Sequence, residues 1–184
     1  FAKRKLIMKQ LSIDLIETFQ RYFDALDAVS EEEFIHKESD EIWSLAQMME
    51  HVHGSGYTFF LENVNGCLEQ IKGQIGGGLT DAGSYIMQKN GFPVASKYKH
   101  PKQASSELIG RQIADYKKGM PALLEALLVT IPEIEKDAGE YKTQHFVFGM
   151  MNAEQWLRNT EFHIRHHTVQ MNELRAYFLA AQIS

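Results

Sequence analysis

Histidine is the residue type in this chain whose number and spacing point most directly to chemistry. Eight are present among 184 residues, and five of them form two short groups, His51 with His53 and His163 with His166 and His167. Neutral imidazole is the commonest metal ligand in proteins. Positions four apart on a helix share a face, whereas positions two apart do not. His163 and His167 can therefore reach one ion together, and only one of His51 and His53 can face inward.

The residues around these histidines are typical of a polar site inside a helical protein. The face that carries His163 and His167 continues through Trp156, Thr160, Gln170 and Leu174. Two imidazoles on an inward stripe are costly unless polar partners or a cation satisfy them. The face of His51 is unusually polar, with Gln47, Ser55, Thr58 and Glu62. A third ligand from a facing helix would complete a metal site in a bundle, and histidines satisfied without a metal are the alternative.

Other reactive side chains give weaker signals. The candidates for a general base are Glu62, Glu161 and Glu173, but carboxylates on helix surfaces are usually solvated. Cys67 could be a nucleophile, although a lone cysteine is more often an inert buried residue. Arg158 and Arg165 could face an anionic substrate or solvent. The remaining histidines, His36, His100 and His145, fall in predicted loops and are expected to be solvated.

Several function classes are excluded by pattern or composition. There is no HExxH motif, so a thermolysin-like protease is not indicated. Gly76, Gly77 and Gly78 are consecutive, but no Lys-Ser or Lys-Thr follows them, so the phosphate-binding loop pattern fails. A net charge of −5 and a pI near 5.9 argue against nucleic-acid binding. No apolar run approaches the roughly 20 residues needed to cross a membrane, and one cysteine allows no internal disulfide.

Four stretches with helical periodicity must position these residues. They run from about 5 to 29, 40 to 71, 105 to 129 and 152 to 180. Asn152 and Gln155 have the spacing of a capping box at the start of the last stretch. Pro121 predicts a kink or a short break in the third. With almost no strand alternation, the pattern predicts an all-α four-helix bundle, with residues 1–184 as a single domain.

The segment from Gly73 to Ala104 lacks a sustained period and is predicted to be a long irregular link between helices two and three. Its length would allow those two helices to run parallel, whereas short links favour antiparallel neighbours. Loops this long in a compact domain are uncommon and often functional. The basic residues Lys97, Lys99 and Lys102 in the link are read as a solvated loop.

Three motifs resemble the DinB-like proteins. Trp43-Ser44 followed by Glu50-His51-Val52 is similar to the family's helix-two motif. Residues 148–156, Phe-Gly-Met-Met-Asn-Ala-Glu-Gln-Trp, resemble the start of its helix four. Residues 162–167, Phe-His-Ile-Arg-His-His, with Gln170, resemble its H-x-x-H-H-x-x-Q signature. The resemblance covers about forty residues near both ends of the chain and little of the middle.

The resemblance implies a bundle of up-down-down-up connectivity that binds one divalent metal through His51, His163 and His167, with His166 outside the ligand set. Three imidazoles would leave coordination positions open for water or substrate. We expect zinc or nickel, in that order, because imidazole suits both. Some relatives transfer a low-molecular-weight thiol to an electrophilic small molecule, so this reaction is the leading expectation, with hydrolysis of a small substrate as a close variant.

Two non-catalytic functions are the alternatives: a metal-binding structural or sensor module, and an interaction domain in which the histidines are relics. The expected partner is a small molecule, and the resemblance implies that it is a thiol. Neither a nucleic acid nor a membrane is expected as a partner. The resemblance also leaves a homodimer open. Cytoplasmic location is the default expectation for a chain of this composition.

Overall fold

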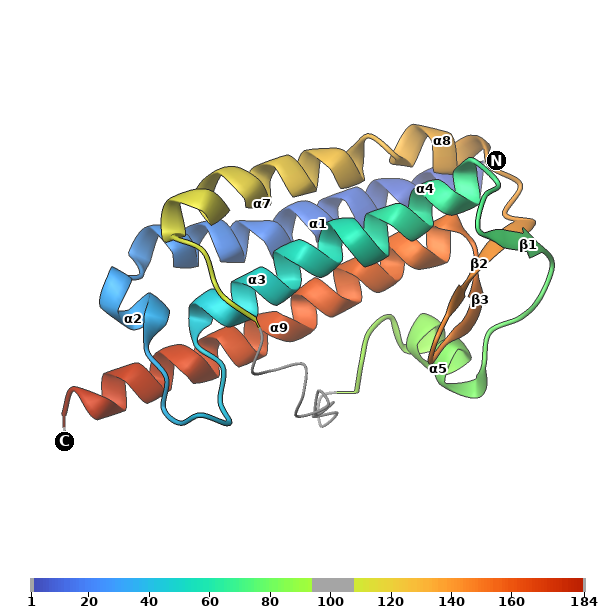
Figure 1. Ribbon diagram of the computed structural model, residues 1–184. Coiled ribbons are helices and arrows are strands. Elements are labelled where there is room, and N and C mark those ends of the chain that lie inside the picture. Colours follow the sequence, from blue (N-terminus) through green and yellow to red (C-terminus); the bar gives the residue numbers. More distant parts are fainter. Residues whose placement is uncertain (1, 94–107, 184) are drawn as a thin grey trace.

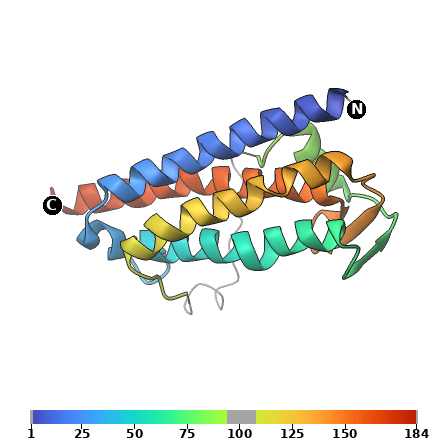
Figure 2. The same ribbon diagram turned by 90° about the horizontal axis from the view of Figure 1, so that it is seen from above.

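Four long helical stretches lie side by side in the computed structural model, which describes residues 2–93 and 108–183 (Figures 1 and 2). They are α1 (Ala2–Ala28), the stretch from α3 to α4 (Leu45–Leu68), α7 (Ile113–Leu128) and α9 (Ala153–Ala181). α1 packs against α7 and α9, while α3 and α4 both pack against α9. The helical bundle predicted from periodicity is confirmed.

Local sequence explains where these helices begin. Asn152 accepts a hydrogen bond from the backbone of Gln155 and its own backbone N–H is bonded by the Gln155 side chain, so the predicted capping box is present. Ser44 and Gln47 form a second capping box at the start of α3. Ser30 caps a short helix, α2 (Glu31–Ile35), between the first two long stretches.

The second stretch is not one regular helix. It consists of α3 (Leu45–Ser55), a π-helical turn η1 (Gly56–Leu61) and α4 (Glu62–Leu68). Val52, Gly56, Phe60 and Val64 are all buried although they are spaced by four residues. Such spacing drifts by about 40° per step around an α-helix, and the wider π turn absorbs the drift. The buried stripe therefore stays on the core along the whole stretch.

The prediction of an irregular link from Gly73 to Ala104 is wrong over its first part. This part contains strand β1 (Gly73–Ile75) and helix α5 (Asp81–Lys89). β1 pairs antiparallel with β2 (Tyr141–His145), which pairs antiparallel with β3 (Gly149–Met151). Strands this short have no period to detect, and their pairing depends on residues almost seventy positions away. Residues 94–104 of the predicted link lie outside the described residues.

The third helical stretch and the connection after it also differ from prediction. α7 begins at Ile113, later than the predicted start near residue 105, which lies outside the described residues. α7 continues through Pro121 without the predicted break. A further short helix, α8 (Ile131–Lys136), follows it with Pro132 in its first turn, where proline is tolerated.

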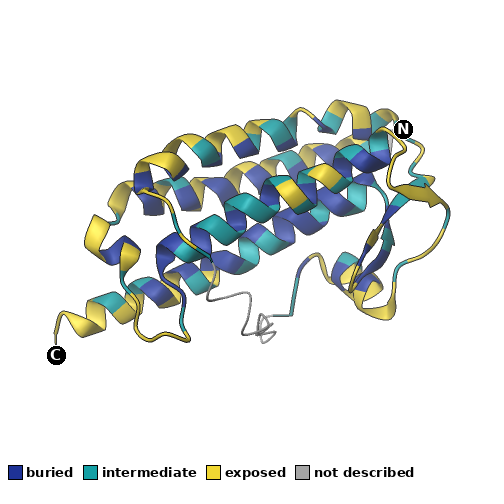
Figure 3. Cartoon of the chain, in the orientation of Figure 1, coloured by how far each residue is buried: buried dark blue, intermediate teal, exposed yellow. Residues whose placement is uncertain are grey.

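The core runs along the axis of the bundle. Large side chains from different helices are fully buried there, among them Phe19, Tyr22, Tyr116 and Trp156. Figure 3 shows the buried faces turned toward one another and the outer faces exposed. Among the described residues, no helix is long and apolar enough to cross a membrane.

Candidate metal centre

His51, His163 and His167 come together between α3 and α9. One ring nitrogen from each lies within 4.8 Å of the others. The ring centroids are 5.0 Å apart for His51 and His163, 4.9 Å for His51 and His167, and 4.6 Å for His163 and His167. His167 is buried and the other two are half-buried. The three residues that the family resemblance predicts as ligands, two of them also paired by their helix face, are therefore adjacent in the structure.

The packing of two helices produces this arrangement. α3 and α9 are in direct contact, and each begins at a capping box that sets its register. His163 and His167 lie one turn apart on the same face of α9, as their spacing predicts. His51 reaches them from the facing side of α3.

Neighbouring side chains orient the imidazoles. His167 Nδ1 lies 2.6 Å from Gln170 Oε1, and an amide oxygen can only accept, so Nδ1 carries the proton and Nε2 keeps its lone pair. Ser55 Oγ lies 3.4 Å from His163 Nε2 and donates to the His51 carbonyl at 2.6 Å. Hydrogen bonds from neighbouring side chains to the ring nitrogen that does not bind the metal fix the ring orientation of metal-binding histidines.

Aromatic rings form the apolar wall of the cluster. The Trp43 ring lies 5.2 Å from the His51 ring, and the Phe60 ring lies 4.8 Å from the His163 ring. An apolar shell lowers the local dielectric and limits the approach of water.

These residues fit a divalent cation. Bonds of about 2.1 Å to imidazole nitrogen bring ligand atoms around one ion to within roughly 4.2 Å of each other. The observed separations between the ring nitrogens are up to 4.8 Å. Small rotations of the rings would reduce them to that value. Three neutral nitrogens suit zinc, nickel, copper or iron, so the donor set does not select one of them.

The other histidines of the two groups face elsewhere. His53 points toward the start of α7, and its Nδ1 accepts from Arg111, just before that helix, at 2.8 Å. Burial, and then the nearby Arg111 charge, lower the pKa of His53. His166 packs its ring edge against Phe92, and burial lowers its pKa. Neither contributes to the cluster, as expected.

A polar network that joins α3 to the residues around the start of α7 was not predicted. Glu50 Oε2 accepts from Tyr116 at 2.6 Å and from Arg111 at 2.8 Å. Burial acts to raise the pKa of Glu50, but the hydrogen bonds from Tyr116 and Arg111 outweigh it and lower that pKa. Burial and the hydrogen bond to Glu50 raise the pKa of Tyr116 to about 12. This network attaches the start of α7 to α3. Nothing local in the sequence signals it, because Glu50 and Arg111 are 61 positions apart.

The structure places none of the three predicted bases in the cluster. Glu62 and Glu173 are exposed, and Glu62 is paired with Lys72. The expectation of a solvated Glu161 is wrong, because its side chain is buried at 2% exposure. It accepts from Thr18 at 2.8 Å and from Arg165 at 2.8 Å. The Thr18 contact ties α9 to α1, and the Arg165 contact lies within α9.

The two candidate anion-binding arginines hold α5 instead. Arg158 donates to the Met87 carbonyl at 2.9 Å, and Arg165 donates to the Asn90 carbonyl at 2.7 Å. Asn90 is the C-cap of α5 and has a left-handed backbone with φ of 54°. Cationic groups are favourable where helix carbonyls end, so both arginines dock α5 on α9.

The prediction that His145 is solvated is wrong. It ends β2 with 4% exposure, and its ring stacks on Phe146 and Phe148. Its Nδ1 accepts from the backbone of Val147 at 3.0 Å and of Phe148 at 3.1 Å. Burial lowers its pKa to about 4, so the ring is neutral and shapes the β2–β3 turn.

The last two predicted loop histidines have different outcomes. His36 is half-buried rather than solvated, and its ring lies 5.4 Å from Phe178. His100 lies outside the described residues.

Cys67 is buried, as the inert interpretation predicted. Its thiol lies 3.3 Å from the Met151 carbonyl oxygen, to which it donates. Burial raises its pKa, which keeps it in the unreactive thiol form.

Asn159 is a buried polar residue that the sequence gave no reason to select. It lies one helical turn before His163 on α9 and has 1% exposure. Neither its amide oxygen nor its amide nitrogen has a hydrogen-bond partner among the described residues. Buried amides are normally satisfied, so this one is expected to meet water or a ligand.

Fold and site together define a class: a helical bundle with a three-histidine cluster that could hold a metal ion between two helices. The family model of the DinB superfamily matches residues 14–171. The chain belongs to the DinB superfamily, and the resemblance seen in its motifs is confirmed. Among curated proteins and among solved structures, none matches the chain.

Proposed function

We propose that His51, His163 and His167 bind one divalent metal ion, zinc or nickel, and that the protein uses it in catalysis. The observation that supports the proposal is the convergence of three ring nitrogens within 4.8 Å from two packed helices. A bound divalent cation lowers the pKa of a thiol or water beside it. Three protein ligands leave room for such a group.

The proposed reaction is transfer of a low-molecular-weight thiol to an electrophilic small molecule, with hydrolysis of a small substrate as the variant. In this scheme the three imidazoles hold the ion, Gln170 fixes the proton of His167 on Nδ1, and Trp43 and Phe60 keep the surroundings apolar. A divalent cation would lower the pKa of a bound thiol enough for its proton to pass to solvent water. The resulting thiolate would need no protein base, which suits a cluster without a carboxylate among the described residues.

The second candidate is a non-catalytic metal-binding module with a structural or sensing role. It is favoured by the absence of a base among the described residues at the cluster and by the burial of His167. In that case no exogenous thiol or substrate would bind at the metal.

Measuring the metal content of the purified protein tests metal binding, which both candidate functions require. Protein purified without a His tag should hold about one equivalent of zinc or nickel. His163→Ala should lose it, whereas His166→Ala, which changes a neighbouring histidine outside the cluster, should keep it. If the wild-type protein holds no metal after incubation with zinc or nickel and desalting, the proposal is wrong and a helical interaction domain is the better description.

Cobalt substitution separates the two candidates. Co²⁺ in a three-histidine site with an open position should develop a thiolate charge-transfer band in the near ultraviolet when 2-mercaptoethanol is added. A spectrum unchanged by thiol, in protein that holds one cobalt, would favour the non-catalytic module. The same titration on His163→Ala is the control for thiol binding elsewhere.

We also infer that the bundle has up-down-down-up connectivity within a single domain. The order of colours in Figure 1 supports this, since the α3–α4 stretch and α7 run in one direction and α1 and α9 in the other.

A further inference from the structure

α9 carries two buried polar side chains whose polar atoms have no hydrogen-bond partner among the described residues. They are Asn159, with 1% exposure, and Trp156, which is fully buried. The atoms concerned are both amide atoms of Asn159 and the indole nitrogen of Trp156. Buried polar groups are normally satisfied, so each exception marks a place where a polar group of a ligand can bind.

Both side chains lie next to the histidine cluster. Asn159 is one helical turn before His163, and residues four apart on a helix have Cβ atoms about 5–6 Å apart. Trp156 is one turn further toward the N-terminus of α9. The Phe60 ring links these turns, because its centroid lies 4.8 Å from that of His163 and 6.4 Å from that of Trp156. The two polar side chains therefore continue the face of α9 that carries the proposed metal ligands.

Asn159 lies between two groups of aromatic rings. The face of α9 described above packs against Phe60 of η1. The next face packs against Phe92, which follows α5 and whose ring centroid lies 6.4 Å from Phe162 and 5.7 Å from His166. Because an α-helix turns by about 100° per residue, position 159 falls between these two faces. Its amide is therefore placed among apolar rings, where an unmade hydrogen bond is costly.

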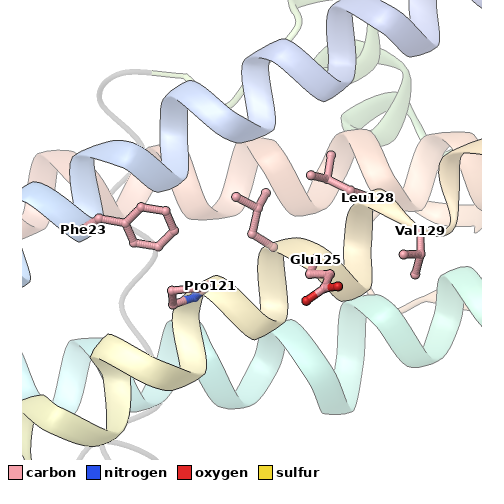
Figure 4. Close-up of a pocket in the computed structure, with 6 residues that line it drawn as sticks. Phe23, Pro121, Glu125, Leu128 and Val129 are labelled. Carbon is pink, nitrogen blue, oxygen red and sulfur yellow. The ribbon is translucent and has the colours of Figure 1, made fainter.

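The apolar groove between α1 and α7 offers no comparable group. It encloses about 340 Å³, and Figure 4 shows its side chains on facing sides of the gap between the two helices. Its polar side chain is the carboxylate of Glu125, and the other lining residues are Phe23, Pro121, Leu124, Leu128 and Val129. These residues belong to α1 and α7, whereas the three histidines belong to α3 and α9. The face of α9 is therefore better placed than the groove to select a ligand at the metal.

We propose that Asn159 binds a hydroxyl or amide group of the ligand that occupies the open position of the metal. The inference rests on the proposed function and adds the residue that selects the ligand. An asparagine amide offers both donors and an acceptor, so its complement is a group that also donates and accepts. Because Asn159 is one turn from His163, this group must lie a few bonds from the metal-binding atom. The expected ligand is a small thiol with a hydroxyl or an amide near its sulfur.

Two thiols of the same shape test this selection on the cobalt-substituted protein. 2-Mercaptoethanol has a hydroxyl where 1-propanethiol has a methyl group, and each binds through sulfur with loss of its proton to solvent. The thiolate charge-transfer band gives both dissociation constants. Asn159→Leu should lower the preference for 2-mercaptoethanol by about 3- to 10-fold, the range of one neutral hydrogen bond. The matched control is Thr160→Val, which should keep the preference, because the buried Thr160 hydroxyl already donates to the Trp156 carbonyl at 2.8 Å.

NMR of the wild-type protein separates a hydrogen bond from the apolar contact that leucine would add. In isotope-labelled, zinc-loaded protein, the side-chain amide protons of Asn159 should shift downfield on saturation with 2-mercaptoethanol but not with 1-propanethiol. The same response to both thiols, or an equal preference in the wild type and Asn159→Leu, would overturn the inference and leave thiol binding at the metal intact. Cobalt-substituted protein that shows no thiolate band with either thiol would overturn the proposed thiol transfer and this inference with it.

Discussion

The orientation of His167 depends on one neighbouring side chain, Gln170. Its amide oxygen holds the Nδ1 proton at 2.6 Å, which presents Nε2 to an ion. Gln170→Leu removes the acceptor, and we expect metal affinity to fall about 10- to 100-fold. Gln170→Glu keeps an acceptor and should retain the affinity. Competition against a chromophoric chelator measures both, and equal affinities for the Leu variant and the wild type would contradict this role.

Asn159 should lower the stability of the metal-free protein. Its amide is buried with no partner among the described residues, and leaving such a group unsatisfied costs about 1–3 kcal/mol. Asn159→Leu has a similar shape and no polar atoms, so its free energy of unfolding should rise by about 1 kcal/mol or more. Urea unfolding of the metal-free protein gives the value. A loss of stability instead would show that an ordered water satisfies the amide.

His145 should make stability depend on pH. Its pKa is about 4 in the folded protein against an ordinary value of 6.5, so the unfolded chain binds more protons between these values. Stability should therefore fall as the pH drops from about 6.5 to about 4, by about 3 kcal/mol in total. His145→Asn keeps an acceptor but does not titrate. Its urea-unfolding stability should be lower at pH 7 and should change less with pH than that of the wild type.

The secondary structure shows which elements a sequence can reveal. The long helices were predictable because their buried residues recur locally and because Asn152 and Gln155 sit at capping distance. The π turn was not, because a four-residue spacing such as Val52 to Gly56 also fits an ordinary helix. β1 was missed because its pairing partner, Thr143 for Gly73, is distant in sequence. Elements whose stability comes from non-local contacts leave no local pattern.

The contact between α5 and the β2–β3 turn depends on Gly83. A Cβ at this position would collide with the Phe148 carbonyl oxygen, which also accepts from the Thr80 backbone at the start of α5. Gly83→Ala should destabilise the protein by about 1–3 kcal/mol and increase amide exchange in α5. Gly78→Ala is the control, because a Cβ there meets nothing within 4 Å. Equal stability of the two variants would show that α5 shifts freely.

The candidate site required both local and long-range information. The pairing of His163 with His167 follows from the spacing alone. Choosing His51 rather than His53 required either the polarity of the helix face that carries His51 or the family resemblance. The contact between α3 and α9 supports this choice. Glu161 and the two arginines Arg158 and Arg165 were misjudged because their partners, Thr18, Met87 and Asn90, come from other elements. Charged residues on a helix cannot be assigned to solvent until the neighbouring elements are known.

A metal bound by the three histidines would join α3 to α9, so metal binding should stabilise the whole bundle. A ligand that binds only the folded state adds about 2.7 kcal/mol at one hundred times its dissociation constant. Thermal unfolding of the metal-free protein should therefore shift to higher temperature as zinc or nickel is added. The shift should be absent in His163→Ala and present in His166→Ala. If the wild-type midpoint does not move at metal concentrations that load the site, the ion binds the unfolded chain equally well and does not connect the helices.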